Sequence, residues 1–518
     1  MEASRCVVQA LTWLTLVALF HYITTTLCHH LRRHKHRYPP GPKPWPIIGN
    51  LNLVGSIPHQ SYHYLSQKYG DIMQLKFGSV PVMVISSPEM AKEILQTHDQ
   101  TFASRPALAS GKYTAYNYSN MFWAPNGPHW HQARKIYLKD LLSPKRIESY
   151  EHIRMEERHS LMSRLYVLSG TETTIKEELT RFMLTSMTRM TYGGKYFSVS
   201  KSDHSFSEVK LEELKEMIDE WFFLNGAFNI GDWIPWLSFL DLQGYVKRMK
   251  ALRKKFDRFH DIVIADHKAK REAEKDNFVA KDMVDDVLQL VDDPNLEVKL
   301  NSDQVKGLLQ DPIIAGTEAS AVTLEWAICE LLKQPELLRK ATEELDRVIG
   351  RDRLVEEDDI PNLPYICAIV KETMRLHPGG TLLAPHFSTE DCKIAGYDIP
   401  KGTIVFVNAW AIGRDPRYWE ASEKFMPERF FEKNIDVTGH NFELLPFGSG
   451  RRICPGYRLA LIMIQSTLAN LVHGFSLKLP DNMKPEDVEM GEEFALATRK
   501  KIPVAVVIEP RLSAHLYA

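Results

Sequence analysis

Apolar residues recur along most of the chain with the spacing of amphipathic helices. Residues 335–349 illustrate the pattern: leucine, alanine, valine and isoleucine fall on one face, and arginine, lysine and glutamate fall on the other. Pro335 suits the first turn of this helix, where its missing N–H is not required. Pro312 would remove a helical hydrogen bond, so we expect a kink at that position. The pattern predicts long helices at residues 130–165, 170–193, 208–225, 244–275, 302–333 and 335–349.

Shorter runs carry the signals of strands and turns. Residues 72–77 and 80–85 are rich in β-branched and apolar side chains, and Gly78-Ser79 between them predicts a β-hairpin. Ser87-Pro88 follows and predicts the start of a short helix. Further strand-like runs lie at residues 393–399, 403–408 and 502–508. The sequence therefore predicts a mainly α-helical protein with a small β-sheet region and no internal repeat.

The beginning of the chain has the pattern of a membrane anchor. Residues 7–28 are mostly apolar, and about 20 such residues suffice to cross a bilayer. The basic cluster at residues 31–37 is expected to stay on the cytosolic side. A cleaved signal peptide is the alternative, but the charge cluster directly after the run and the lack of a clear Ala-x-Ala site favour retention. We expect a single-pass anchor at residues 1–30, a basic, proline-rich hinge at 31–47 and one domain at 48–518.

Composition narrows the class of protein. Among 518 residues, 64 basic side chains nearly balance 66 acidic ones, so the sequence shows no footprint of nucleic-acid binding. The six cysteines are scattered without CxxC or CxxH spacing. This argues against a disulfide framework or a zinc site and suits a reducing compartment.

The most informative segment is the loop from Phe447 to Gly456. Cys454 stands in it among glycines, including Gly448, and arginines, including Arg452, just before an apolar run. A single thiolate is a strongly donating ligand for haem iron, and arginine can fork onto a carboxylate. A buried cysteine in a turn is the alternative for any lone cysteine. The complete pattern, Phe-x-x-Gly-x-Arg-x-Cys-x-Gly, resembles the haem-binding loop of the cytochrome P450 family.

Three other charged residues fit the same resemblance. Glu372 and Arg375 lie three positions apart, which places them on one face of a helix, and Arg429 follows in a Pro-Glu-Arg-Phe segment. Alone, Glu372 and Arg375 would be read as a surface ion pair. In this family the corresponding residues lock the loop that carries the cysteine, so the resemblance implies a structural role for all three.

The resemblance also implies how haem b would be held. Trp130 and Arg134 match the family's Trp-x-x-x-Arg and lie one helical turn apart, so both can reach a haem propionate. Arg452 is the other expected propionate partner, and Phe447, Gly448 and Gly456 would frame the cofactor around Cys454. His386 stands where relatives often have arginine, which puts one propionate contact in doubt.

The expected oxygen-activating helix departs from the family pattern. Residues 315–320 read Ala-Gly-Thr-Glu-Ala-Ser, so Glu318 keeps the acid of the family's acid–alcohol pair but Ala319 replaces the alcohol. Ser320 lies about 100° further round the helix and does not simply replace it. Thr317 or a water is a candidate substitute, and a substrate hydroxyl is another. Thr317, Glu318 and Ser320 are therefore the candidate catalytic residues.

The resemblance covers the chain from the hinge to the cysteine loop and is closest to plant microsomal enzymes of the clan 71 group. It implies a cytochrome P450 fold, with a catalytic domain at residues 48–518 anchored in the endoplasmic-reticulum membrane. It also implies a haem-thiolate monooxygenase that uses dioxygen and NADPH through cytochrome P450 reductase on a small apolar substrate. No nucleic-acid partner is expected.

Segments at residues 111–119, 230–237 and 241–248 are similar to the family-92 branch, which includes homoterpene synthases. These enzymes cleave nerolidol or geranyllinalool to dimethylnonatriene or trimethyltridecatetraene. The apolar, aromatic pocket segments and the alanine at position 319 favour this activity, because a tertiary alcohol brings its own hydroxyl. The alternatives are hydroxylation of flavonoid, fatty-acid or terpenoid substrates, a reductase-independent isomerase or dehydratase, and a non-catalytic haem protein.

Overall fold

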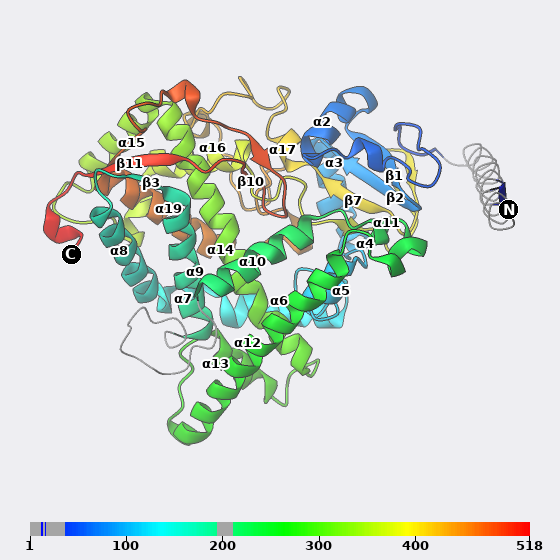
Figure 1. Cartoon of the computed structure of the whole chain (residues 1–518), viewed down its shortest axis with the longest axis horizontal. Coiled ribbons are helices and arrows are strands. Elements are labelled where there is room, and N and C mark those ends of the chain that lie inside the picture. Colours follow the sequence, from blue (N-terminus) through cyan, green and yellow to red (C-terminus); the bar gives the residue numbers. More distant parts are fainter. Residues whose placement is uncertain (1–11, 14–15, 17–36, 194–210) are drawn as a thin grey trace, which may run out of the picture.

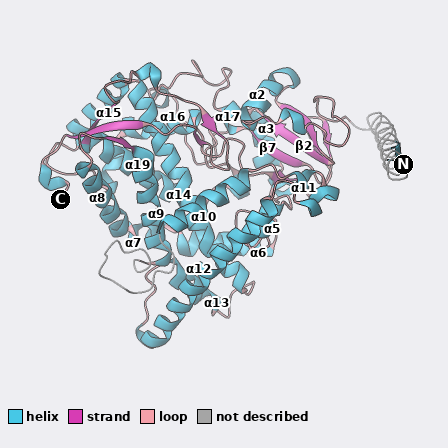
Figure 2. Ribbon diagram, viewed as in Figure 1, coloured by secondary structure: helices cyan, strands magenta, loops and turns pink. Residues whose placement is uncertain are grey.

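The computed structural model describes residues 12–13, 16, 37–193 and 211–518. Helices make up most of the molecule; β1, β2 and β7 lie at the end beside the described start of the chain, and β3 and β11 lie at the opposite end (Figures 1 and 2). The long helices are α8 (Glu151–Val167), α9 (Ile175–Tyr192), α10 (Leu211–Gly226), α12 (Tyr245–Glu274), α14 (Ser302–Lys333), α15 (Pro335–Val348), α16 (Pro364–Leu376) and α19 (Tyr457–Gly474). The prediction of a mainly helical protein with small sheets is confirmed.

Shorter helices connect the long ones. They are α2 (Pro58–Tyr69), α3 (Pro88–Lys92), α4 (Asp99–Phe102), α5 (Ala109–Thr114), α6 (Pro128–Ile136), α7 (Pro144–Ser149), α11 (Ile230–Trp233), α13 (Met283–Val291), α17 (Ala409–Ile412) and α18 (Arg429–Glu432). Tighter or wider turns occur at η2 (Glu93–Thr97), η3 (Tyr137–Leu141), η5 (Pro235–Leu240) and η8 (Gly450–Arg452).

The strands form four small sheets. The largest has the order β1-β2-β7-β4, in which β1 (Ile72–Phe77) and β2 (Val80–Ile85) form the predicted hairpin. Strand β7 (Ile404–Val407) runs parallel to β2, and β4 (His386–Phe387) lies antiparallel to β7. The other sheets join β3 (Glu172–Thr174), β11 (Ala505–Pro510) and β8 (Phe475–Lys478); β5 (Cys392–Ile394) and β6 (Tyr397–Ile399); and β9 (Glu492–Glu493) and β10 (Arg499–Lys500).

Helix α14 lies at the centre of the helical part, packed against α9, α16 and α19 (Figure 1). Nearly every residue from Val305 to Leu332 is buried. Its buried residues occur on all sides of the helix, as expected for a helix in the interior of a large domain. Asn301 and Gln304 form a capping box at its first turn, so the helix begins at a fixed residue. Its position fixes one wall of the cavity described below.

One predicted helix is wrong. The segment 130–165 is not a single helix, because Pro144 lacks the N–H that a continuing helix would need. The chain breaks at Ser143, whose backbone is extended (φ −64°, ψ 153°) and whose side chain accepts a hydrogen bond from the Arg146 amide. Helices α6, α7 and α8 therefore replace the single helix. The predicted strand at 393–399 is likewise a hairpin, because Ala395 and Gly396 both have positive φ.

A buried ion pair joins α12 to the start of α13. His267 Nδ1 donates to the Val263 carbonyl at 2.8 Å, and Nε2 lies 3.1 Å from Asp282 Oδ2. Burial opposes protonation of this imidazole, but the Asp282 carboxylate outweighs burial and raises the pKa of His267 above its ordinary value. The pair therefore favours a protonated histidine inside the fold.

The predicted anchor at residues 1–30 lies almost entirely outside the described residues, as does the basic part of the hinge up to residue 36. Within the described part of the chain, no helix combines the length and apolar character needed to span a bilayer. The hinge from Arg37 onward packs against the domain. The Arg37 amide donates to Asp398 Oδ2, its carbonyl accepts from the Asp398 amide, and the Pro40 carbonyl accepts from the Gln74 amide.

Candidate active site

A cavity of about 350 Å³ lies between the middle of α14 and the loop that precedes α19. Most of its wall is apolar, and its charged lining residues are Arg105, Arg134, Asp311 and Arg452. Its apolar lining includes Met121, Phe122, Met187, Trp221, Phe222, Ile314, Leu383 and Leu496. Such an enclosure can hold a flat cofactor and a small apolar molecule, with little polar surface to fix the orientation of that molecule.

The loop from Phe447 to Gly456 forms one wall and carries the Cys454 thiol. The Phe447 carbonyl accepts a hydrogen bond from the Cys454 amide at 2.9 Å, which closes the loop on itself. Gly450 has φ +66°, and a Cβ there would lie 1.9 Å from the Leu95 carbonyl oxygen. Only glycine therefore fits this turn. The conformation of the loop therefore depends on this glycine and on the backbone hydrogen bond at Cys454.

The environment of the Cys454 sulfur suits a metal ligand. Burial raises the pKa of this thiol, while a hydrogen bond from the Gly456 backbone amide and the Arg134 guanidinium act in the opposite direction. A buried thiolate is thus disfavoured unless a further cation stabilises it. Haem iron is such a cation, so the donor set at Cys454 fits the group that the sequence predicts.

Three guanidinium groups converge on this cavity, from Arg105, Arg134 and Arg452. Burial, together with the charges of Arg105 and Arg134, lowers the pKa of Arg452 to about 7, and burial lowers that of Arg105 to about 9. Within the part of the chain that the structure describes, none of the three forms an ion pair with a carboxylate. Crowded cations without a counter-ion indicate an anionic ligand. The two carboxylates of haem b would supply that charge.

Arg105 was not identified from the sequence. Its guanidinium donates to the carbonyls of Phe122, Ala384 and Pro385, so it ties three wall segments together beside the predicted propionate partners. The only signal in the sequence is a single arginine within the otherwise small and apolar residues 102–107. Burying a charged side chain in such a run costs free energy, and a bound anion would offset that cost.

Trp130 and His386 occupy the same side of the cavity. Trp130 Nε1 is buried and has no hydrogen-bond partner among the described residues, and the Arg452 guanidinium lies 4.2 Å from the Trp130 ring centroid. A cofactor carboxylate would satisfy this orphaned donor. Burial lowers the pKa of His386 to about 3, and Nδ1 lies 2.9 Å from the Phe102 carbonyl. The neutral ring must therefore donate through Nδ1, which leaves Nε2 without a proton to give a carboxylate.

Glu372, Arg375 and Arg429 meet in the core, outside the cavity. Glu372 accepts two hydrogen bonds from Arg375, both at 2.7 Å, and one from Arg429 at 3.0 Å. Arg375 also donates to the carbonyls of Gly413, Ser422 and Lys424. The three side chains thus hold the backbone at residues 413–426, which leads into the cysteine loop. They touch no cavity surface, as a structural role requires.

The three candidate catalytic residues on α14 lie in different surroundings. Ser320 lines the cavity, and none of the described side chains or backbone groups hydrogen-bonds its hydroxyl. Thr317 does not line it, and its hydroxyl donates to the Ile313 carbonyl at 2.6 Å. Glu318 is buried away from the cavity, 3.7 Å from Arg499, and burial raises its pKa. Ala319 presents a methyl group to the cavity in place of an alcohol.

Gly316 lines the cavity next to α9. A Cβ on Gly316 would lie 2.7 Å from the Met187 Sδ and Cε atoms. The absence of a side chain allows α9 and α14 to pack closely at this point. Met187, which the sequence did not identify, consequently reaches the cavity.

Pro312 is accommodated by a hydrogen bond from outside its helix. Because proline has no N–H, the Leu308 carbonyl loses its partner four residues ahead. The Tyr137 hydroxyl donates to this carbonyl at 2.6 Å. One residue earlier, Asp311 accepts hydrogen bonds from Asn120 Nδ2 and the Met121 amide, each at 2.7 Å. These contacts bind the loop over the cavity to α14.

Comparison with known proteins places this arrangement in a family. A sequence model of the family "Cytochrome P450" matches residues 39–504. The chain is 45% identical to "Trimethyltridecatetraene synthase" of Zea mays over 92% of this chain and 89% of that protein. It is 43% identical to "Dimethylnonatriene synthase" of Zea mays (93% of each chain) and 41% identical to "Flavonoid 3',5'-hydroxylase" of Campanula medium (93% of each chain). A solved zebra fish cytochrome P450 with abiraterone has a TM-score of 0.71 and 25% identity, covering 88% of this chain and 100% of that one.

Proposed function

The chain belongs to the cytochrome P450 family of monooxygenases, and on this premise we propose that it cleaves tertiary terpene alcohols oxidatively to homoterpenes. The observation that carries the proposal is the joint occurrence of an unpartnered Ser320 hydroxyl and the Ala319 methyl on the cavity wall. A substrate with its own hydroxyl complements both. The two relatives named as triene synthases, at 45% and 43% identity, support the same substrate class.

Haem b, when bound, supplies activation of dioxygen with electrons from NADPH. Cys454 would hold its iron, and Arg105, Arg134, Arg452 and Trp130 would hold its carboxylates, as the unpaired charges and the orphaned indole N–H require. The apolar wall would exclude water around the substrate.

Ser320 would bind the substrate alcohol. Its hydroxyl has no protein partner among the described residues, so binding breaks no existing hydrogen bond. Thr323 offers a matched comparison, because its hydroxyl lines the same cavity but already donates to the Ala319 carbonyl at 2.9 Å. Glu318, raised in pKa by burial, would hold a proton behind the wall. Thr317 would act only through the backbone of α14.

The test is headspace gas chromatography–mass spectrometry of microsomes that contain the protein and a plant reductase. Nerolidol and geranyllinalool are supplied with and without NADPH. NADPH-dependent release of a C11 or C16 hydrocarbon is expected. Product formation without NADPH would instead support an isomerase or dehydratase. No volatile product, in a sample whose reduced carbon-monoxide spectrum shows intact haem-thiolate, would refute the proposal.

Two substitutions test the assignment within α14. Ala319→Thr restores the family alcohol and is expected to shift products from cleavage toward hydroxylation. Ser320→Ala is expected to raise KM for the alcohols about tenfold or less, since one neutral hydrogen bond contributes about 1 kcal/mol. Thr323→Val is the control and should change neither the ratio of products nor KM for the alcohols. An unchanged product ratio in Ala319→Thr would contradict the role given to position 319.

Hydroxylation of a flavonoid is the second candidate. Relatives named as flavonoid hydroxylases are 41% and 40% identical, only slightly less than the triene synthases. The aromatic side chains of Phe122, Trp221 and Phe222 could stack on a planar substrate. A substrate-induced spectral shift with a flavonoid and none with nerolidol would favour this alternative.

We further propose that the protein is a single-pass endoplasmic-reticulum protein that receives electrons from cytochrome P450 reductase. The apolar run at residues 7–28 and the basic cluster after it support this location. Retention of the full chain in the membrane fraction after carbonate washing is expected, with the domain accessible to added protease. Release into the wash would refute the anchor.

A further inference from the structure

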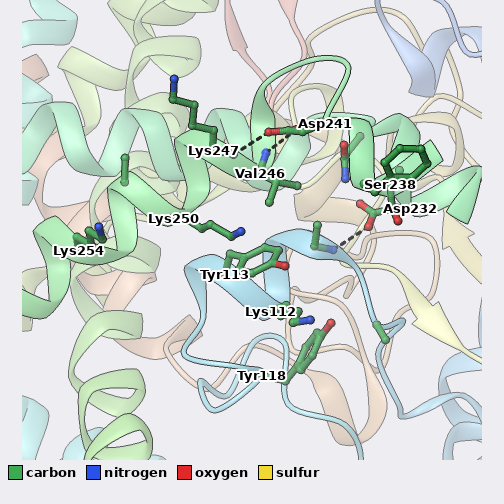
Figure 3. A pocket seen from close by; sticks show the side chains of 16 residues that line it. Lys112, Tyr113, Tyr118, Asp232, Ser238, Asp241, Val246, Lys247, Lys250 and Lys254 are labelled. Atoms are coloured by element: carbon green, nitrogen blue, oxygen red, sulfur yellow. Dashed lines mark hydrogen bonds between the residues drawn. The ribbon is translucent and has the colours of Figure 1, made fainter. Parts of the chain in front are cut away.

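The chain from α5 to α6 passes from the outer surface of the domain to the active-site cavity. Its first part lines an outer groove of about 760 Å³, which also involves the α11–η5 segment and α12. Figure 3 shows Tyr113 and Tyr118 in this groove, opposite α12. Met121 and Phe122, a few residues later, line the active-site cavity, which shares no lining residue with the groove. Asn120 lies at the boundary between the two and is fully buried.

The three residues that precede this boundary by a few positions form a strained turn. Tyr116, Asn117 and Tyr118 have φ values of 51°, 55° and 61°, in the left-handed region that residues other than glycine rarely adopt. Such strain persists only where the surrounding structure fixes it, and it is common beside binding sites. The Tyr118 hydroxyl donates to the Leu108 carbonyl at 3.0 Å, which holds one side of the turn. We therefore expect the turn to relax if the contacts that follow it are removed.

The contacts that follow the turn join Asn120 to α14. Asn120 Nδ2 donates to Asp311 Oδ1, and the Met121 amide donates to Asp311 Oδ2, each at 2.7 Å. Asn120 Oδ1 accepts a hydrogen bond from the Trp123 amide at 2.9 Å. Gly307 allows the close approach of the helix, because a Cβ there would lie 3.0 Å from the Asn120 nitrogen. The hydrogen bonds of Asn120 and Asp311 thus fix the loop at both ends of its turn into the cavity.

Asp311 is the acidic side chain among the described residues that line the active-site cavity. Burial raises the pKa of Asp311 to about 7, although the hydrogen bonds from the Met121 amide and Asn120 lower it. The carboxylate is therefore kept in a mostly apolar wall at a cost in free energy. Both of its oxygens accept hydrogen bonds from the loop, which assigns the carboxylate to the position of the loop.

Two arginines that are expected to hold the haem carboxylates contact the same loop. Arg452 donates to the carbonyls of Met121 and Ala124 at 3.1 and 2.6 Å, and Arg105 donates to the Phe122 carbonyl at 3.1 Å. The loop is thus fixed between α14 and the cofactor site. Because Met121 and Phe122 in its middle form part of the cavity wall, a displacement of the loop would change the space beside the cofactor.

From the strained turn and the hydrogen bonds that follow it, we propose that Asn120 and Asp311 are a positioning pair that determines which molecules the active-site cavity accepts. The pair holds Met121 and Phe122 at the cavity wall against relaxation of the turn before them. Asp311 acts through the loop and does not itself react. The inference concerns the shape of the cavity and holds whichever substrate the enzyme oxidises.

The experiment measures the binding of two azoles to the haem-loaded full chain by difference spectroscopy at pH 8, above the raised pKa of Asp311. Imidazole occupies little space beyond the iron, whereas clotrimazole carries three aryl rings that extend into the cavity. Asp311→Asn replaces one acceptor oxygen by a donor, so either Asn120 or the Met121 amide loses its partner. It is expected to raise the Kd for clotrimazole about tenfold and the Kd for imidazole less than about twofold. Asp303→Asn, at a partly exposed acid on α14 that pairs with Arg253, is the matched control and should change neither Kd.

A reversed pair tests whether the two residues act together. In the double variant Asn120→Asp, Asp311→Asn, the amide at position 311 can donate to the carboxylate at position 120 and still accept from the Met121 amide. The Kd for clotrimazole should therefore return to within about threefold of the native value. Hydrogen exchange of residues 119–124, which we expect to be faster in each single variant, should slow again in the reversed pair.

The outcomes separate the proposal from a general disturbance of the protein. An unchanged Kd for clotrimazole in Asp311→Asn would overturn it. Equal weakening of imidazole would also overturn it, because the effect would then lie at the cofactor and not at the cavity wall. A reversed pair that binds clotrimazole no better than the single variants would overturn the pairing. If a single variant fails to bind haem, the reversed pair decides: haem loading with a near-native Kd for clotrimazole supports the proposal, and failure to load haem refutes it.

Discussion

The hydrogen bond from Tyr137 to the Leu308 carbonyl predicts a specific coupling with Pro312. Removing the hydroxyl by Tyr137→Phe leaves a buried carbonyl without its donor, because Pro312 has no N–H to replace it. In a Pro312→Ala background, the new N–H at position 312 can form the ordinary helical hydrogen bond. The same tyrosine substitution should then have little effect.

The geometry of the hydrogen bond between Tyr137 and Leu308 sets the size of the expected loss of stability. The donor and acceptor are 2.6 Å apart, and Tyr137 is 2% exposed, so water cannot replace the lost hydroxyl. An unsatisfied buried acceptor costs about 1–3 kcal/mol. We expect Tyr137→Phe to cost about 1.5 kcal/mol in the native sequence and under about 0.5 kcal/mol in Pro312→Ala, a coupling of about 1 kcal/mol.

A haem protein of this size is expected to unfold irreversibly, so its stability is best measured as a rate. The half-life of the reduced carbon-monoxide spectrum at a fixed elevated temperature is compared among the four proteins of the cycle. A loss of about 1.4 kcal/mol from the barrier shortens the half-life about tenfold. Tyr62→Phe is the matched control, since the Tyr62 hydroxyl is fully buried and no group in the described part of the chain hydrogen-bonds it.

Equal shortening of the half-life by Tyr137→Phe in both backgrounds would refute this reasoning. It would mean that the tyrosine stabilises the fold through its packing and not through the carbonyl that Pro312 leaves free. A loss of similar size in Tyr62→Phe would show that removal of any buried hydroxyl has this effect.

Three further outcomes are expected. Gly316→Ala should cost about 1 kcal/mol of thermal stability, because its Cβ meets Met187, and the same glycine substitution should cost little more in a Met187→Ala background, where that side chain is absent. Arg452→Met should lower the haem-to-protein ratio measured as pyridine haemochrome, whereas Arg451→Met, at an exposed neighbour, should not. Because the pKa of His267 is raised in the folded protein, its stabilisation is fully present below about pH 6.5 and is lost as pH rises through the folded value. The half-life advantage over His267→Gln should therefore be larger at pH 6 than at pH 9, and an equal advantage at both would contradict the assigned pKa.

Local sequence patterns, such as apolar periodicity and turn residues, predicted most elements of the fold. Helix α14 was predicted at residues 302–333 from its apolar pattern, and the structure shows that Asn301 and Gln304 cap its start while Pro335 begins the next helix. The hairpin of β1 and β2 followed from alternating apolar residues around Gly78-Ser79. The failure at 130–165 arose because helical periodicity was given more weight than Ser143-Pro144, which ends one helix and caps another.

The residues of the active-site cavity were likewise predicted only in part. Motif spacing identified Cys454 and Arg452, which lie together on the cavity wall. It missed Arg105 because the three carbonyls that this guanidinium binds come from segments distant in sequence. It also treated Thr317, Glu318 and Ser320 as one group, although helical geometry directs neighbouring side chains to different sides and only Ser320 reaches the cavity.

The attachment of the hinge has a practical consequence for engineering the enzyme. Residues Arg37 and Pro40 form backbone hydrogen bonds with Asp398 and Gln74, and Gly41 packs so closely on the Gln74 carbonyl that a Cβ would lie 1.9 Å from it. The segment from Arg37 to Gly41 is therefore part of the folded domain. A version fused to another anchor or directly to a reductase should keep the residues from Arg37 onward, because a cut at residue 47 would remove the hydrogen bonds of Arg37 and Pro40 and the close packing of Gly41 against the domain.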